Sequence, residues 1–362
     1  MPKINNQFEL KNNDIKRSKK VIFLLLALFI FGVLPIIVIE IAGRVVIHSQ
    51  YGVEGKSYGL WRYDSETGAQ HNENAYNKFT TTNDFGFRNV EDVLEPKEKE
   101  SFRILTYGGS TTFCYNLSDE EAWPARLEQQ LRKFRHPKDQ VLNAGAINWS
   151  LGHAFARAKK DIPVLKPDYV LIYSGINEGA NANSLRNENI EMKALVADGK
   201  YGVITKNFDQ NRWLKRNSII VRVYDYYVKA FITELFSNQD EEGTSPESIF
   251  IDPNPDEYVL KNYLVVLEDF IEFIEQNGAK AVFIIQSNGD NSNLNRKLTS
   301  YSIAGAAAAS KLGVKVVDSR DLLNDSELSD DLFYHHTEVH YSATGALKLA
   351  DLIAREAFGL VD

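Results

Sequence analysis

Short apolar runs alternate with longer stretches of helical periodicity through the central and C-terminal parts of the chain. The runs lack strict apolar–polar alternation, as expected for strands that are buried on both faces of a sheet. The predicted strands are 102–107, 140–143, 169–173, 279–286 and 314–318. One predicted helix starts at Ser118, where Glu121 completes a capping-box pattern, and the others cover about 150–163, 256–277, 295–312 and 342–358. Regular alternation of strands and helices predicts a three-layer α/β/α domain with a central parallel sheet.

The N-terminal part carries a continuous apolar run over residues 21–39. At about 1.5 Å per residue, a helix of this length nearly crosses a hydrocarbon core of about 30 Å. Four basic residues precede the run, whereas only Glu40 and Arg44 follow it closely. The positive-inside rule therefore predicts a single-pass anchor with a cytoplasmic N-terminus and an extracytoplasmic chain after about residue 45. A cleaved signal peptide and a buried core helix are the competing interpretations, but signal peptides have shorter apolar regions, and this run is apolar on all faces.

These patterns divide the chain into four parts and one insertion. We expect a cytoplasmic tail over 1–20, a membrane helix over 21–41, a connecting or lid segment over 45–100, and the α/β domain over 101–362. Residues 179–255 interrupt the rhythm of strands and helices and are too long for a plain loop. This insertion contains an aromatic-rich helix candidate over 218–236, and it is either an added helical subdomain or a wall over the substrate.

Composition narrows the classes of function. The chain is 44% hydrophobic and 25% charged, which is ordinary for a globular protein. Its net charge of −8 gives no electrostatic reason to expect a nucleic-acid partner. Cys114 is the only cysteine, so the chain has no intramolecular disulfide. His335, His336, Glu338 and His340 cluster, but their spacing fits no standard zinc motif, and we expect neither a metal nor a cofactor.

Three separate segments carry groups that can act together on an ester. The turn Gly108-Gly109-Ser110 follows the first predicted strand of the domain, so it places a serine at the sheet edge where open parallel sheets bind ligands. A serine hydroxyl becomes a good nucleophile when a base such as histidine takes its proton, and His340 precedes the last helix. Asn177 follows the third strand and can help to bind a developing oxyanion.

Four blocks in this order resemble the SGNH (GDSL-type) hydrolases, in particular a membrane-anchored branch with a Gly-Gly-Ser-Thr-Thr nucleophile block. The blocks are Gly108-Gly109-Ser110-Thr111-Thr112, Asn143-Ala144-Gly145, Gly175-Ile176-Asn177-Glu178 and Thr337-Glu338-Val339-His340. The resemblance implies a flavodoxin-like fold, with Ser110 as the nucleophile and His340 as the general base. It implies that the Asn177 amide and the Ser110 N–H bind the oxyanion, and it adds the block glycines Gly109 and Gly145 to the expected oxyanion or substrate-binding residues.

Two positions depart from the family pattern. Asn148 stands where the family usually has a glycine that donates to the oxyanion; its N–H can still donate, since Asn tolerates left-handed geometry, or its side chain can donate instead. Thr337 stands where the family has the aspartate that orients the histidine. Glu338 can replace that aspartate, a backbone carbonyl can orient the ring in a Ser–His dyad, or the site is impaired. We favour a working dyad helped by Glu338.

The sequence therefore predicts a membrane-anchored, extracytoplasmic serine esterase that removes short acyl groups such as acetyl from a glycan or a lipid-linked sugar. This substrate is inferred from location and resemblance. The alternatives are an acyltransferase to an envelope glycan with the same serine, and a catalytically impaired protein for glycan binding or assembly. We expect Arg88 to form a structural ion pair, with contact to an anionic or sugar substrate as the alternative. The sequence does not indicate an oligomeric state.

Overall fold

The computed structural model describes residues 19–64, 67–180, 218–224, 254–289, 293–324, 331–333 and 339–360. The chain divides into two compact units, which we describe separately. The α/β unit comprises residues 53–213 and 240–362, and the N-terminal unit comprises residues 1–52 and 214–239.

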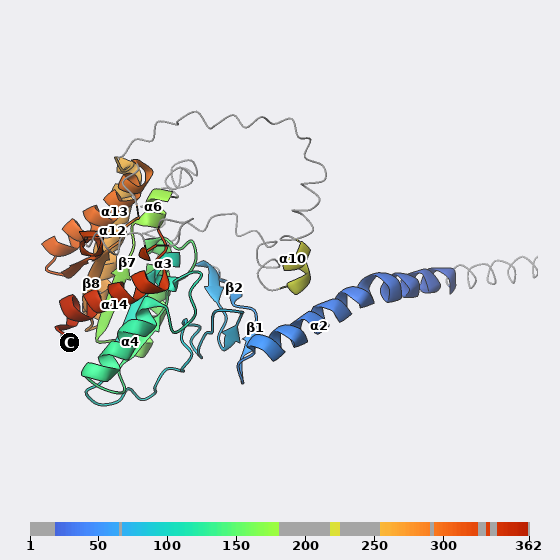
Figure 1. Ribbon diagram of the computed structural model, residues 1–362. Helices are drawn as coiled ribbons and strands as arrows, with labels where there is room; N and C mark the ends of the chain where they lie inside the picture. The colour runs from blue at the N-terminus through green and yellow to red at the C-terminus, as the bar shows by residue number, and fades with distance from the viewer. Residues whose placement is uncertain are drawn as a thin grey trace, which may run out of the picture. The chain divides into compact units, whose positions relative to one another are not determined.

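A parallel five-stranded sheet forms the centre of the α/β unit (Figure 1). Its strands are β5 (Arg103–Gly108), β6 (Gln140–Asn143), β7 (Tyr169–Tyr173), β8 (Lys280–Ile285) and β9 (Lys315–Asp318). They lie in the order β6-β5-β7-β8-β9, with parallel pairing at each step. This order is that of flavodoxin-like sheets, in which the chain reverses direction across the sheet between the first and third strands. The predicted strands are confirmed to within one residue at each end, and the predicted fold class is confirmed.

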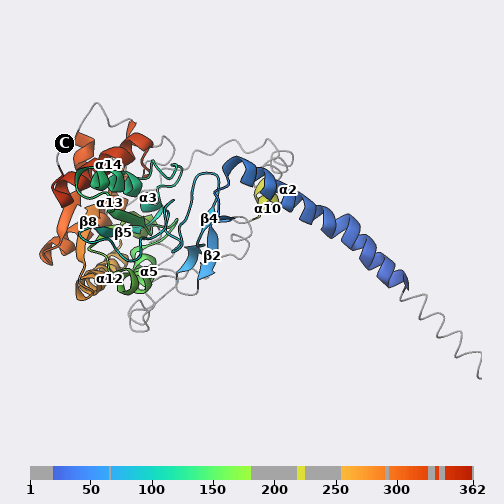
Figure 2. The same cartoon turned by 90° about the horizontal axis from the view of Figure 1, so that it is seen from below.

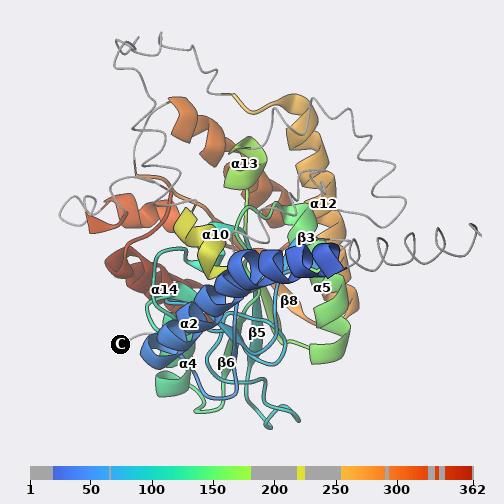
Figure 3. The ribbon, with the colours of Figure 1, turned by 90° about the vertical axis from the view of Figure 1, so that its right-hand side faces the viewer.

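Helices cover both faces of the sheet (Figure 3). One layer contains α5 (Leu151–Leu165), α12 (Glu257–Gln276) and α13 (Asn293–Lys311), and the other contains α4 (Trp123–Phe134) and α14 (Ala343–Phe358). Successive strand residues point to opposite faces, so Ile104 belongs to the core under α4 and α14, whereas Leu105 belongs to the core under α5 and α12. Three short helices, α3 (Ser110–Phe113), α6 (Ile176–Ala180) and η3 (Ser319–Asn324), follow strand ends.

The start of α4 corrects one sequence prediction. The helix begins at Trp123 instead of Ser118, and its N-cap is Ala122, which has an extended backbone. The Glu121 carboxylate does accept hydrogen bonds from the N–H and the hydroxyl of Ser118, at 2.9 and 2.8 Å, but these bonds close a turn before the helix. Pro124 in the first turn is the more reliable marker of this helix start, because the ring fixes φ and leaves no amide N–H unpaired.

Two small sheets precede the central sheet in the α/β unit (Figure 2). Strand β1 (Ser57–Tyr58) pairs with β4 (Ala75–Tyr76), and β2 (Trp61–Asp64) pairs with β3 (Gly68–His71). The rings of Trp61 and His71 pack on the ring of Phe113, with centroid distances of 6.2 and 5.0 Å. This part of the expected connecting segment therefore contacts α3, the helix that begins with Ser110.

The N-terminal unit contains a continuous helix from Lys19 to Tyr51 that is long and apolar enough to cross a membrane. Its apolar side chains are exposed, as in a helix that is surrounded by lipid. A π-helical turn, η1 (Phe29–Val33), ends two residues before Pro35, which lies in the first turn of α2 (Leu34–Tyr51). The remaining part, α2, continues past residue 41, where the membrane segment was expected to end.

The first turn of the expected 218–236 helix packs on α2 within the N-terminal unit. Helix α10 (Ile219–Val223) begins after Ser218, and the Glu40 carboxylate accepts hydrogen bonds from the Ser218 hydroxyl and the Ile219 N–H at 2.9 and 3.0 Å. Gly43 allows this approach, because a Cβ atom there would lie 2.9 Å from Cγ2 of Ile219. Residues 225–236 lie outside the described residues.

Candidate active site

The structure brings Ser110 and His340 together, although 230 residues separate them in the sequence. Strand β5 ends at Gly108, Gly109 caps α3, and Ser110 is the first residue of this helix. His340 lies just before α14, and its Nε2 is 2.8 Å from Oγ of Ser110. This distance allows direct proton transfer between a nucleophile and its general base.

The residues after His340 fix its position. Tyr341 is buried, and its hydroxyl lies 2.5 Å from Oγ of Ser287 beyond the carboxyl end of β8. The Tyr341 ring stacks on Phe333 with a centroid distance of 4.8 Å. Ser342 then caps α14 by accepting a hydrogen bond from the Gly345 N–H at 3.1 Å. The backbone at His340 is therefore held by a buried tyrosine and a capped helix directly after it.

Burial controls the electrostatics of His340. Because the imidazolium form is less well solvated in this partly buried site, the pKa of His340 lies below its ordinary value. Its Nδ1 atom is buried, and no group among the described residues accepts a hydrogen bond from it. Thr337 and Glu338 lie outside the described residues, as do His335 and His336, so the predicted role of Glu338 stays a prediction.

Asn177 lies against the nucleophile turn. It is the second residue of α6, and its Nδ2 donates a 2.7 Å hydrogen bond to the carbonyl oxygen of Trp149. A Cβ atom on Gly109 would lie only 2.2 Å from the same nitrogen, so only glycine at this position allows the amide to approach so closely. An amide nitrogen carries two hydrogens, and the second remains for a ligand.

The backbone at the start of α3 offers another donor. The first N–H groups of a helix have no partner within the helix. In the part of the chain that the structure describes, no hydrogen bond is recorded from the N–H of Ser110. The Ser110 N–H and the Asn177 amide are therefore the candidate pair that would bind an oxyanion formed at Ser110.

Asn148 and Gly145 differ in what they contribute to the loop between β6 and α5. Asn148 is exposed and has a φ of 65°, so it adopts the left-handed conformation that the sequence suggested it would tolerate. Its role as an oxyanion donor stays a prediction. The Gly145 N–H instead donates to Oδ1 of Asn143 at 3.0 Å, and a Cβ atom there would lie 2.5 Å from the backbone nitrogen of Phe113. Gly145 thus permits close packing of this loop on α3.

Glu178 connects the Asn177 segment to α5. Its carboxylate is buried and accepts hydrogen bonds from the Leu151 N–H at 2.6 Å and the Gly175 N–H at 3.1 Å. Burial raises the pKa of this carboxyl group. Two neighbouring side chains therefore attach the block 175–178 to α5: Glu178 binds the first turn of this helix, and Asn177 binds the carbonyl of Trp149 just before it.

Gln286 is a residue at this site that sequence reasoning missed. It directly follows β8 and is buried. Its Oε1 accepts a 2.8 Å hydrogen bond from the N–H of Ile176, next to Asn177, and its Nε2 donates at 2.8 Å to Oγ1 of Thr111, next to Ser110. One side chain therefore connects the nucleophile block to the oxyanion block. The available signal was a polar residue at the carboxyl end of an otherwise apolar strand.

Arg88 forms the structural ion pair that the sequence predicted. Its buried guanidinium lies 3.1 Å from Oδ1 of Asp119 and donates to the carbonyl oxygens of Phe113, Cys114 and Leu117. These carbonyls belong to the end of α3 and the loop after it. Arg88 thus attaches the segment before the central sheet to the chain that directly follows the nucleophile.

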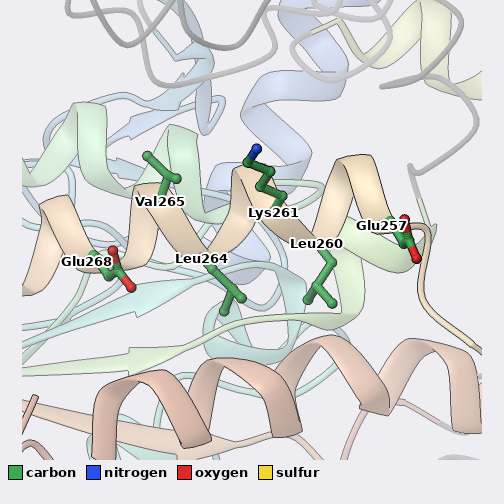
Figure 4. A pocket seen from close by; sticks show the side chains of 6 residues that line it. All are labelled: Glu257, Leu260, Lys261, Leu264, Val265 and Glu268. Carbon is green, nitrogen blue, oxygen red and sulfur yellow. The ribbon is translucent and has the colours of Figure 1, made fainter. Parts of the chain in front are cut away.

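No group of metal-binding side chains is found among the described residues. A surface hollow on α12 is lined by Glu257, Leu260, Lys261, Leu264, Val265 and Glu268 (Figure 4). None of these six residues belongs to the sequence blocks that contain Ser110 and His340.

No protein-family model matches the chain, and no curated protein matches it either. Solved structures do match. An acetylxylan esterase, Axe2 from Geobacillus stearothermophilus, is 16% identical over 72% of this chain and 96% of its own, with a TM-score of 0.43. A lipolytic protein of the G-D-S-L family from Desulfitobacterium hafniense is 14% identical over 70% of this chain and 99% of its own, with a TM-score of 0.42.

A third matching structure is LAE5, an alpha/beta hydrolase from the metagenome of Lake Arreo. It is 14% identical over 72% of this chain and 97% of its own, with a TM-score of 0.45. At these levels of similarity, the function has to be argued from the residues of this chain.

Proposed function

We propose that the chain is a membrane-anchored, extracytoplasmic serine esterase that removes short acyl groups such as acetyl from a glycan or a lipid-linked sugar. The observation that carries the proposal is the 2.8 Å contact between Nε2 of His340 and Oγ of Ser110, beside the amide of Asn177. The resemblance of four sequence blocks to SGNH hydrolases supports it.

In the acylation step, the Ser110 oxygen attacks the carbonyl carbon of the ester while Nε2 of His340 takes the hydroxyl proton. The carbonyl oxygen becomes an oxyanion, to which the Ser110 N–H and the second Asn177 amide hydrogen donate. The tetrahedral intermediate then collapses, and the bond to the alcohol oxygen breaks. His340 gives its proton to that oxygen, so the sugar leaves as a neutral alcohol and the acyl group stays on Ser110.

In the deacylation step, a water molecule takes the place of the alcohol. Nε2 of His340 removes a proton from the water as its oxygen attacks the acyl carbon. The second tetrahedral intermediate releases the carboxylic acid, and His340 returns the proton to Oγ of Ser110. The depressed pKa of His340 suits this role, because the imidazole has to be neutral at the start of each step.

The N-terminal helix supports the proposed location. It is long and apolar enough to span a bilayer, and basic residues precede its apolar run. An extracytoplasmic enzyme next to a membrane can reach acylated envelope glycans and lipid-linked sugars, and this location is the basis of the proposed substrate class.

The experiment is ester hydrolysis by the full-length protein in detergent, with p-nitrophenyl acetate as substrate. We expect turnover that Ser110→Ala and His340→Ala abolish while the thermal unfolding transition persists. Unchanged turnover in Ser110→Ala would exclude the mechanism. Adding a sugar acceptor and analysing the products separates hydrolysis from acyl transfer: free acetate supports an esterase, and an acetylated acceptor supports a transferase.

A further inference from the structure

Tyr115 is an exposed aromatic residue beside the general base. Its relative exposure is 46%, and its ring centroid lies 6.1 Å from that of His340, with the two planes inclined by 58°. Tyr115 lies in the loop after α3, five positions after Ser110 in the chain. An exposed ring in contact distance of the imidazole forms part of the surface around the reacting atoms.

The backbone holds this ring in place. Cys114 and Asn116 both have left-handed conformations, with φ of 58° and 74°, which non-glycine residues rarely adopt. Such conformations persist only where the surroundings enforce them. Here the Tyr115 N–H donates to the Ser110 carbonyl at 3.1 Å, while Arg88 donates to the carbonyls of Cys114 and Leu117 at 2.7 and 2.6 Å. The exposed position of Tyr115 is therefore enforced by buried polar contacts.

The chemistry at His340 determines which part of a substrate would lie on this ring. In an ester cleavage, the imidazolium protonates the alcohol oxygen that leaves, so the alcohol part of the ester has to lie next to His340. For a small acyl group, the alcohol is the larger part and extends from the site. Among the described residues, Tyr115 is an exposed aromatic ring next to His340, so the departing alcohol would meet it.

We infer that Tyr115 is a stacking surface for the sugar ring that carries the acyl group. This inference rests on the proposed esterase function and specifies how its substrate is recognised. A tyrosine offers a rigid, amphipathic face, on which the apolar C–H face of a sugar can pack while its hydroxyls stay in water.

The test compares two acetate esters with different alcohol parts, glucose pentaacetate and ethyl acetate, on full-length protein in detergent. We expect Tyr115→Ala to lower kcat/KM about tenfold for glucose pentaacetate, mainly through KM, and to change kcat/KM for ethyl acetate less than about twofold. Tyr115→Trp should retain activity on both esters. The matched control is Phe134→Ala, which removes another exposed aromatic ring, 40% exposed on α4, and should change neither value.

Several outcomes would overturn the inference. Equal losses on both esters would show that Tyr115 acts on His340 and not on the sugar, and no loss on glucose pentaacetate would show that the ring does not contact the substrate. A wild-type protein that hydrolyses neither ester would contradict the proposed function. In that case, calorimetric binding of glucose pentaacetate to Ser110→Ala still decides the inference: the additional Tyr115→Ala change should weaken binding about tenfold, and equal binding would overturn it.

Discussion

Replacing Gly109 by alanine tests whether the glycine exists to admit the Asn177 amide. The added Cβ would lie 2.2 Å from Nδ2 of Asn177 and 3.0 Å from the carbonyl oxygen of Trp149. The backbone itself tolerates alanine, since φ of −88° and ψ of −150° are extended values. Non-bonded contacts of carbon are normally near 3.5 Å, so the amide has to move by about 1 Å. A displacement of this size costs up to about 10²-fold in turnover.

The loss of turnover in Gly109→Ala cannot exceed the contribution of the Asn177 amide to catalysis. Removal of one oxyanion donor lowers kcat by roughly 10²- to 10³-fold, equivalent to about 2.7–4 kcal/mol. We therefore expect Asn177→Ala to lower kcat by this factor and Gly109→Ala to lower it by about 10²-fold. The Gly109→Ala variant should remain folded, because overpacking by one methyl group typically costs about 1–3 kcal/mol of stability.

The decisive assay is a double-mutant cycle on the hydrolysis of p-nitrophenyl acetate. If Gly109→Ala acts by displacing the amide, it has little further effect once Asn177→Ala has removed that amide, and the double variant should have nearly the kcat of Asn177→Ala. Thermal unfolding of all variants is the control for stability. A double variant whose loss equals the product of the two single losses would refute the steric link, as would a Gly109→Ala protein with wild-type kcat.

Three other predictions concern the same site. Gln286→Met removes the hydrogen bonds to Thr111 and Ile176, so kcat should fall by up to about 10²-fold with a smaller change in KM. The control, Gln276→Met at the exposed end of α12, should change neither constant, and a change in KM alone for Gln286→Met would contradict the positioning role. Because burial lowers the pKa of His340, the acidic limb of the kcat/KM profile should lie below pH 6.5, and a limb above pH 6.5 would contradict this prediction. The stability of the protein should also decrease as the pH falls through 6.5, because His340 binds a proton more readily in the unfolded state. Burial raises the pKa of the Cys114 thiol to about 11, so iodoacetamide should modify this cysteine only after the protein unfolds. Mass spectrometry measures the alkylation, and rapid alkylation of the native protein would contradict the burial of Cys114.

The strands of the domain were predictable because burial on both faces leaves a simple signal. Runs such as Tyr169–Tyr173 contain almost only apolar residues, and burial of the last four residues of this strand explains why its apolar signal is clear. The start of α4 was not predictable from the Ser118–Glu121 pattern. Here Ser118 donates both bonds to the Glu121 carboxylate and closes an isolated turn, and the sequence pattern alone does not distinguish this turn from the first turn of a helix.

The Ser110–His340 pair was predictable because each residue lies in a recognisable block at the end of a core element. Gln286 and Tyr115 were not, since their significance comes from contacts between distant segments. Gln286 bonds to Thr111 and Ile176, which lie 175 and 110 residues away, and Tyr115 meets His340 across the sheet edge. No local pattern encodes such contacts. Arg88 lies between these cases: an ion pair was expected, but its partner Asp119 became evident only from the fold.

The most direct test of the central claim is labelling of the full-length protein by a fluorophosphonate, with the modified residue identified by mass spectrometry. An activated serine reacts with this reagent, whereas an ordinary surface serine does not. We predict a single covalent adduct on Ser110 in the wild-type protein and its loss in a folded His340→Ala variant. Absence of any adduct on Ser110 in the folded wild-type protein would contradict the assignment of a Ser110–His340 catalytic pair.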